Sequence, residues 1–372
     1  MKTIIPKERK TMNYKIIITL SLILIIFRSL SAQNASETRS FIKTVTVGKE
    51  TTLEVSNKYG TIQITPWNKD SAYIRAEVKA YAKDQSKLKK MFDGITVNIT
   101  DSKYMVRAQT EFTSNINMLF ESFKGMTSKI ISYDSHIEIN YYINIPEYLN
   151  LKIENKYGDV YMENNTGEFN ISISNGSFKA NSLGKKASIT MVFCDAKINS
   201  IGSGNVDASF SEVSIGETED LSINSISSKY DIKKAGMISG ESRRDKFFIE
   251  NIGSLQGNAY FTDYKVNTVR KEINLTTRYG SINADLIEKG FEYININSSY
   301  SDLSLRFDPG SSYNFDIRHI NAFLVLPDKN IKTEQKALNE DKKEYMTYGT
   351  FGKNPGTAKV KIDATRGNIY IK

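Results

Sequence analysis

Residues 53–64 read LEVSNKYGTIQI, and residues 151–162 read LKIENKYGDVYM. Both stretches place apolar residues at alternate positions before and after a shared NKYG tetrapeptide, which occupies 57–60 and 155–158. An alternation of period two is typical of strands with one buried face. Because NKYG interrupts the alternation, each stretch predicts two strands joined at a turn.

The same frame returns in looser copies along the chain. They are TRYGSINADL, SSYSDLSLRF and TRGNIYI, together with a shortened ISISNGSFKA at 171–180. Gly158 and Gly176 lie 18 residues apart, and Gly280 and Ser301 lie 21 apart. A period of this size is typical of one coil of a β-solenoid, in which stacked coils share a continuous core. Antiparallel hairpins are the alternative, but the motif occurs once per interval, which favours stacking.

We therefore predict an all-β fold, a parallel β-solenoid (β-helix) with coils of about 20 residues. In this fold the Tyr-Gly pair has a structural role: glycine permits positive φ at the corner, and tyrosines of neighbouring coils stack. The alternative is an exposed Tyr-Lys ladder that binds sugar rings or peptide. Tyr157, Tyr279 and Tyr300 are the residues to test for that role.

One segment has helical periodicity. In KDQSKLKKMFDGI the residues Leu88, Met91 and Phe92 form one apolar stripe, and Gly94 follows as a stop signal. The sequence predicts a short helix at about 84–93, within an N-terminal β region spanning 42–111.

Two segments interrupt the strand pattern. Residues 112–135 carry apolar residues at helical spacing and are expected to be a cap or insertion, with an apolar flap for a partner or lipid as the alternative. Residues 327–350 are charged and are predicted to form a solvated excursion. Between them, 136–326 hold the coils, and 351–372 form a terminal coil.

The N-terminus is typical of an export signal. A basic region precedes the apolar run Ile16–Phe27, which is too short to span a bilayer, and SLSAQ follows. We predict a signal peptide at 1–32 with cleavage after Ala32 or Ser31, and a linker at 33–41. The expected location is the periplasm or the cell surface, and the processed chain is not expected to be an integral membrane protein.

The charge does not indicate a nucleic-acid partner. The chain of 372 residues has a net charge of +8, but much of this excess lies within 1–32. The remainder is too small for the concentrated basic face that nucleic acid requires.

No residue set predicts an active site, a cofactor site or a metal site. Cys194 lies in an apolar run and is interpreted as buried, and only His136 and His319 are present. An enzyme acting on polysaccharide is the alternative, with Asp316 and Arg318 as suitable residues; alternation places His319 on the opposite face. Aspartates beside the turns are the other acidic candidates: Asp195, Asp207, Asp231, Asp263, Asp285 and Asp302.

The export signal, LEVSNKYGTIQI, the short helix and LKIENKYGDVYM together resemble one group of proteins. These are exported bacterial adhesin-type β-solenoids of the Bacteroidetes, related to the head domains of autotransporter adhesins. The resemblance covers about residues 42–372. It implies a parallel β-solenoid at the cell envelope and transfers no catalytic or binding residue.

The expected function is therefore a non-enzymatic binding or scaffolding module at the cell envelope, with a glycan or an envelope protein as partner. A carbohydrate-active enzyme and a purely structural envelope protein are the alternatives.

Overall fold

A computed structural model describes residues 35–113 and 135–372. The chain divides into two compact units. Unit 1 contains 1–39, 79–95 and 112–137; unit 2 contains 40–78, 96–111 and 138–372. The predicted signal peptide and most of the predicted 112–135 cap lie outside the described residues.

The described elements are one helix and a long series of strands. Up to residue 145 they are β1 (Ala35–Thr46), β2 (Thr52–Lys58), β3 (Ile62–Pro66), β4 (Ser71–Ala82), α2 (Gln85–Asp93), β5 (Ile95–Asp101), β6 (Met105–Phe112) and β7 (Ser135–Ile145). The next are β8 (Asn150–Lys156), β9 (Val160–Asn165), β10 (Phe169–Leu183), β11 (Ala187–Ser209), β12 (Glu212–Ile226), β13 (Lys229–Arg243), β14 (Lys246–Tyr260) and β15 (Asp263–Arg278). The last are β16 (Ser281–Ile287), β17 (Tyr293–Ser299), β18 (Asp302–Phe307), β19 (Tyr313–Ile320), β20 (Phe323–Val325), β21 (Ile331–Asn339), β22 (Glu344–Phe351), β23 (Lys359–Thr365) and β24 (Asn368–Ile371).

Unit 1 is built around α2. The Asp84 carboxylate caps the helix by accepting a hydrogen bond from the Lys87 backbone N–H at 2.8 Å. Leu88, Met91 and Phe92 are its buried residues, and the Arg39 guanidinium lies 4.1 Å from the centre of the Phe92 ring. The helix predicted at about 84–93 is therefore confirmed.

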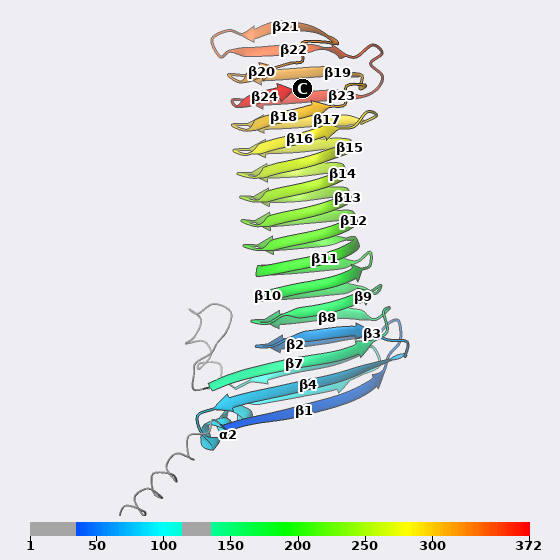
Figure 1. The fold of residues 1–372 in the computed structure, drawn as a ribbon, viewed down its shortest axis with the longest axis vertical. Coiled ribbons are helices and arrows are strands. Elements are labelled where there is room, and N and C mark those ends of the chain that lie inside the picture. Colours follow the sequence, from blue (N-terminus) through cyan, green and yellow to red (C-terminus); the bar gives the residue numbers. More distant parts are fainter. Residues whose placement is uncertain (1–34, 114–134) are drawn as a thin grey trace, which may run out of the picture. The chain divides into compact units, whose positions relative to one another are not determined.

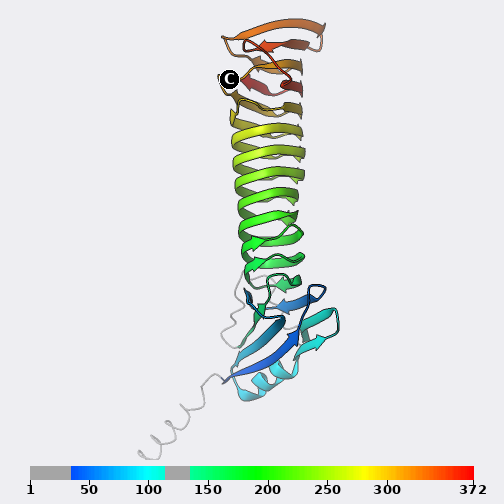
Figure 2. The ribbon, with the colours of Figure 1, turned by 90° about the vertical axis from the view of Figure 1, so that its right-hand side faces the viewer.

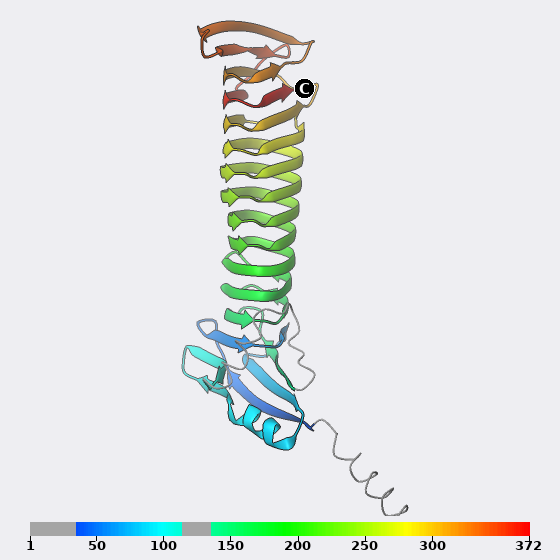
Figure 3. The ribbon, with the colours of Figure 1, turned by 90° about the vertical axis from the view of Figure 1, so that its left-hand side faces the viewer.

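Most of unit 2 is a stack of parallel strands, shown from three sides in Figures 1, 2 and 3. From β10 to β15, each strand pairs in parallel with the next one along the chain. We call one repeat of this path a coil. Equivalent residues lie 18 residues apart at Asp159–Ser177, 17 apart at Ser211–Ser228 and 21 apart at Gly280–Ser301. The expected all-β, largely parallel stack is confirmed, and its commonest step is slightly shorter than predicted.

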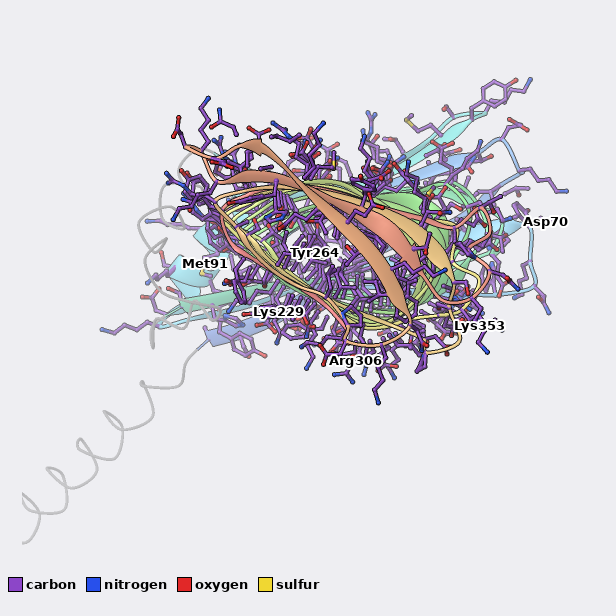
Figure 4. All side chains as sticks on the ribbon, turned by 90° about the horizontal axis from the view of Figure 1, so that it is seen from above. Asp70, Met91, Lys229, Tyr264, Arg306 and Lys353 are labelled. Atoms are coloured by element: carbon purple, nitrogen blue, oxygen red, sulfur yellow. The ribbon has the colours of Figure 1, made fainter. Side chains whose placement is uncertain are left out.

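Along each strand apolar and polar residues alternate, and the apolar side chains fill the interior of the stack. In β12 the residues Val213, Ile215, Leu221 and Ile223 are buried, while the polar residues between them are mostly exposed. Viewed from above, Tyr264 lies inside the wall of strands and Arg306 lies outside it (Figure 4). Because no coil buries its apolar face alone, stacking supplies the core.

The C-terminal strands do not lie last in the stack. β23 pairs in parallel with both β17 and β19, and β24 pairs with β18 and β20. The final coil in sequence is therefore inserted between two earlier ones, although 351–372 was expected to end the stack.

The segment 327–350, expected to be a solvated excursion, contains two antiparallel strands. β22 pairs with β19 and β21 pairs with β22. β21 carries Lys332, Glu334 and Lys336 on an exposed strand, and charges of this kind protect a sheet edge from pairing with other chains.

Candidate functional site

One corner of the stack has the same unusual backbone in coil after coil. A residue with φ between 46° and 67° lies there, and in most coils its N–H donates to a carbonyl of the next coil. In stacking order this corner column consists of Tyr59, Tyr157, Asn175, Phe193, Phe210, Ser227, Arg244, Phe261, Tyr279, Tyr300, Arg366 and Asn321. The left-handed conformation costs a non-glycine residue about 1–2 kcal/mol, so the corner column is strained at its residues other than Asn175 and Asn321.

The expectation that glycine supplies the positive φ is wrong for the Tyr-Gly copies, whereas in TRGNIYI Gly367 has φ 99° beside the left-handed Arg366. In the first NKYG the left-handed residue is Tyr59, with φ 67°, and in TRYG it is Tyr279, with φ 56°. Gly158 serves another purpose, since a Cβ there would lie 2.0 Å from the Gly60 carbonyl oxygen of the preceding coil. The glycine allows close backbone approach between coils, and the tyrosine carries the turn.

A buried polar column stabilises the corner from inside. Ser211 Oγ accepts from the Cys194 N–H at 3.1 Å, and Ser228 Oγ accepts from the Ser211 N–H at 3.2 Å. Each serine hydroxyl also donates to a carbonyl two residues earlier in its own coil, at 2.9 and 3.1 Å. These hydrogen bonds satisfy backbone groups that the turn removes from the regular ladder.

Two members of this inner polar column are titratable. Asp245 accepts from the Ser228 N–H at 2.7 Å and from Ser242 Oγ at 2.7 Å, and burial raises the pKa of its carboxyl group. Burial likewise raises the pKa of the Cys194 thiol. The prediction that Cys194 is buried is confirmed, and its environment disfavours the nucleophilic thiolate.

The side chains of the corner column form stacked rings on the outside. Tyr59 and Tyr157 have centroids 5.5 Å apart, and Phe193 and Phe210 have centroids 5.0 Å apart. Phe261, Tyr279 and Tyr300 continue at 4.9 and 5.1 Å. The predicted stacking of tyrosines between coils is confirmed, and it includes phenylalanines that the Tyr-Gly motif did not identify.

The five rings from Phe193 to Tyr300 are also solvent-exposed, from 36% for Tyr279 to 57% for Phe193, whereas Tyr59 is buried at 9%. Three further apolar side chains, Val192, Ile226 and Tyr260, immediately precede corner residues and are also exposed. Arginines accompany them: Arg278 lies 5.6 Å from the Tyr279 ring centre, and Arg366 lies 4.9 Å from that of Tyr300. Exposed aromatic residues and arginines together are typical of interaction surfaces.

The stacking determines what the rings present to a partner. Neighbouring rings lie within 13–26° of parallel from Phe193 to Phe210 and from Phe261 to Tyr300. The faces between neighbouring rings are therefore covered and the ring edges point to solvent, whereas no ring covers the outer face at the end of each run, as at Phe210 next to Ser227. Stacking on a sugar needs an open ring face, so this arrangement favours contact with protein side chains over a continuous glycan platform.

The enzyme candidates on β19 are not brought together. Arg318 pairs with Glu344 at 2.7 Å and Asp363 at 3.2 Å, whereas Asp316 pairs with Lys359 at 2.8 Å. His319 is on the opposite, buried face, where Nε2 lies 3.2 Å from Thr347 Oγ1 and burial lowers the pKa of the imidazole. The alternation predicted for this strand is confirmed.

The candidate aspartates are distributed over several faces. Asp302 accepts from the Asn368 backbone and side chain, each at 2.9 Å, and Asp263 accepts from Ser281 Oγ at 2.6 Å. Asp195 is in register with Glu212 of the next coil, and Asp207 accepts from Asn224 at 3.2 Å. Among the described residues, no group of three or more His, Cys, Asp or Glu side chains could hold a metal ion.

A shallow depression of about 440 Å³ lies over β3, β9, β10 and β11, lined by residues that include Tyr161, Lys179 and Asn181. Within residues 35–113 and 135–372, no helix has the length and apolar character needed to cross a membrane.

Comparison with known proteins adds little. No family model matches the chain, and no curated protein matches it. One solved structure that matches is described as "a putative cell adhesion protein from Clostridium sporogenes"; it is 12% identical, covers 90% of this chain and 100% of that chain, and has a TM-score of 0.16. At this TM-score the likeness supports no argument about fold or function.

Proposed function

We propose that this chain is a non-enzymatic β-solenoid binding module, exported to the cell envelope, that engages a partner protein along its corner column. The adhesin-type family and the periplasmic or surface location belong to this proposal. They rest on the repeat and on the signal-like N-terminus of the sequence.

One observation carries the proposal. The corner column keeps large aromatic and arginine side chains exposed on left-handed backbone, where glycine or asparagine would fold with less strain. Strained residues in a regular framework are concentrated at functional positions. Stacking between the rings offsets part of the cost of the left-handed backbone. Stacking alone does not require the rings to remain half exposed.

The test is binding of the chain from Gln33 onward to envelope fractions and to a glycan array, with released sugar ends assayed in each sample. Saturable capture of envelope protein without release of sugar ends is the expected result. Release of sugar ends would support the carbohydrate-active enzyme instead. No binding to either material would leave the purely structural role.

A further inference from the structure

Between Phe193 and Tyr300 the corner column lacks rings at two successive positions. From Phe193 to Tyr300 the rings follow one another coil by coil except at Ser227 and Arg244, which separate Phe210 from Phe261. Neighbouring strands are about 4.8 Å apart, so each missing ring leaves a gap of roughly one ring spacing. The Ser227 side chain ends at its hydroxyl and does not fill its own position.

Another part of the column shows what a complete arrangement looks like. Tyr279, Tyr300 and Arg366 occupy three successive corners. The two rings stack at 5.1 Å, the Arg366 guanidinium lies 4.9 Å from the Tyr300 ring centre, and Arg366 Nη1 donates to the Tyr300 hydroxyl at 2.7 Å. The middle tyrosine is thus held between an aromatic ring and a guanidinium.

Phe210, Ser227 and Arg244 occupy three successive corners in the same order, with the same left-handed backbone. Phe210 corresponds to Tyr279 and Arg244 corresponds to Arg366, but serine stands in the place of the middle tyrosine. From this correspondence we propose that the Ser227 corner is a receptor site for a tyrosine side chain supplied by a partner protein.

The surroundings of Ser227 fit such a ligand. Ile226, which is 41% exposed, provides apolar contact beside the site. Arg243 and Arg244 are exposed, and neither has an ion pair with a carboxylate among the described residues. Lys229 is also exposed, and its Nζ lies 3.8 Å from Oε2 of its partner Glu212. Two unpaired guanidinium groups favour a tyrosine with acidic neighbours in its sequence.

The chemistry favours a phenol over a sugar. A guanidinium gains energy over the face of a π system, and it also donates to a phenolic oxygen, as Arg366 does to Tyr300. A pyranose ring can stack its C–H face on Phe210 and can accept from the guanidinium, but it has no π system for the guanidinium to cover. The inference rests on the proposed function, since it specifies the partner chemistry of the same corner column.

The coil structure leaves this corner free for a ligand. Tyr230 and Phe247 follow Ser227 and Arg244 by three residues and stack inside the core, with centroids 4.6 Å apart. These two coils therefore receive aromatic packing from within, and an outer ring is not needed to hold them together.

The test measures binding of a fluorescent five-residue peptide, with a central tyrosine between two acidic residues on each side, to the chain from Gln33 onward. A peptide with alanine at the centre is the ligand control. Ser227→Tyr fills the site with the chain's own ring and is expected to weaken binding at least tenfold. Arg244→Ala is expected to weaken it about fivefold.

Ser214→Tyr is the matched control, since Ser214 is an exposed serine in the same stack but outside the corner column. It is expected to change binding less than twofold, and circular dichroism checks that each variant folds. Equal binding of both peptides, or unchanged binding to Ser227→Tyr, would overturn the inference. So would binding of an acidic oligosaccharide, tested in parallel, in place of the peptide. If the peptide fails while envelope capture persists, only this inference fails, whereas loss of both removes the proposed function.

Discussion

Unit 2 has two columns of stacked rings: an inner column inside the wall of strands and an outer one, which is the corner column. The two differ in how far their rings are exposed to solvent. Tyr230, Phe247 and Tyr264 stack inside the wall with centroids 4.6 and 4.8 Å apart, and each is at most 5% exposed. In the corner column, Phe261 and Tyr279 stack at a similar 4.9 Å but remain 48% and 36% exposed. Equal ring spacing thus accompanies very different burial.

The two columns also complement each other along the stack. Asn175, Ser227 and Arg244 put no ring at the corner, and three residues later each of their coils has a buried ring: Phe178, Tyr230 and Phe247. Phe193 and Phe210 put rings at the corner, and their coils have Ala196 and Val213 inside. There are two kinds of exception: Phe261 and Tyr264 put rings in both columns, whereas the coils of Arg366 and Asn321 have no ring in either, with Ile369 and Leu324 three residues later. The inner rings therefore stabilise the stack, and the outer residues are freer to serve binding.

The largest difference between the columns is expected from truncation of an inner ring. Phe247→Ala removes a buried ring between two stacked neighbours and should lower the free energy of unfolding by about 4 kcal/mol. Phe248→Ala changes the adjacent residue, which is 41% exposed, and should cost less than about 1 kcal/mol. Urea denaturation followed by circular dichroism compares the two, and similar losses would refute the division of roles.

The stability of the stack should also depend on close approach between the backbones of neighbouring coils at the corner, independently of the rings. Gly158→Ala places a Cβ 2.0 Å from the Gly60 carbonyl oxygen, and the required shift between coils should cost about 3 kcal/mol. The control is Gly48→Ala, where no atom lies within 4 Å of the added Cβ. Thermal unfolding of the two variants measures this, and equal melting temperatures would show that the coils tolerate wider spacing there.

Truncation of an outer ring should have a smaller effect on stability. Phe261→Ala loses stacking with Tyr279 and an edge contact with Tyr260, which together should be worth about 1.5 kcal/mol. Chemical denaturation under the conditions used for Phe247→Ala gives the value. A loss as large as that of Phe247→Ala would mean that the corner column is itself a structural core.

The smallest effect concerns the buried acid behind Arg244. Burial raises the pKa of Asp245 in the folded protein, so the folded state binds its proton more tightly than the unfolded chain does. The resulting stability is present at low pH and is lost as pH rises from the unfolded value, about 3.9, through the higher folded value.

Asp245→Ser introduces the hydroxyl group that Ser211 and Ser228 have in the equivalent position, and it removes the charge of the carboxylate. It should raise stability by about 1 kcal/mol at pH 7, and the advantage should shrink below about pH 4. Melting temperatures of both proteins across that range provide the measurement. A constant difference at all pH values would exclude titration of Asp245 as its cause.

Much of the fold could be predicted from local pattern. The alternation around Leu151 and Ile153 gives the strands, and the returning Tyr-Gly frame gives a stack. The left-handed residue was misassigned because glycine adopts positive φ most readily, whereas here contact between coils reserves the glycine for close approach. The insertion of β23 between β17 and β19 depends on pairing between distant segments, which no local pattern encodes.

The candidate site was only partly visible in the sequence. Tyr279 and Tyr300 belong to recognisable motifs, but Phe193, Phe210 and Phe261 have no glycine after them. Their signal is a corner residue followed by a small or buried polar residue and then a charge, as in FCD, FSE and FTD, at a step near 17 residues. The missing ring at Ser227 becomes apparent only when the rings on either side are placed in register.

The most direct test of the account compares two exposed phenylalanines in neighbouring coils. Phe261 belongs to the corner column, whereas Phe248 is of similar exposure but lies on another face. Capture of envelope protein by the chain from Gln33 onward should fall at least tenfold for Phe261→Ser and remain within twofold of the unmodified chain for Phe248→Ser. Equal capture by both variants would contradict the claim that the corner column is the binding surface.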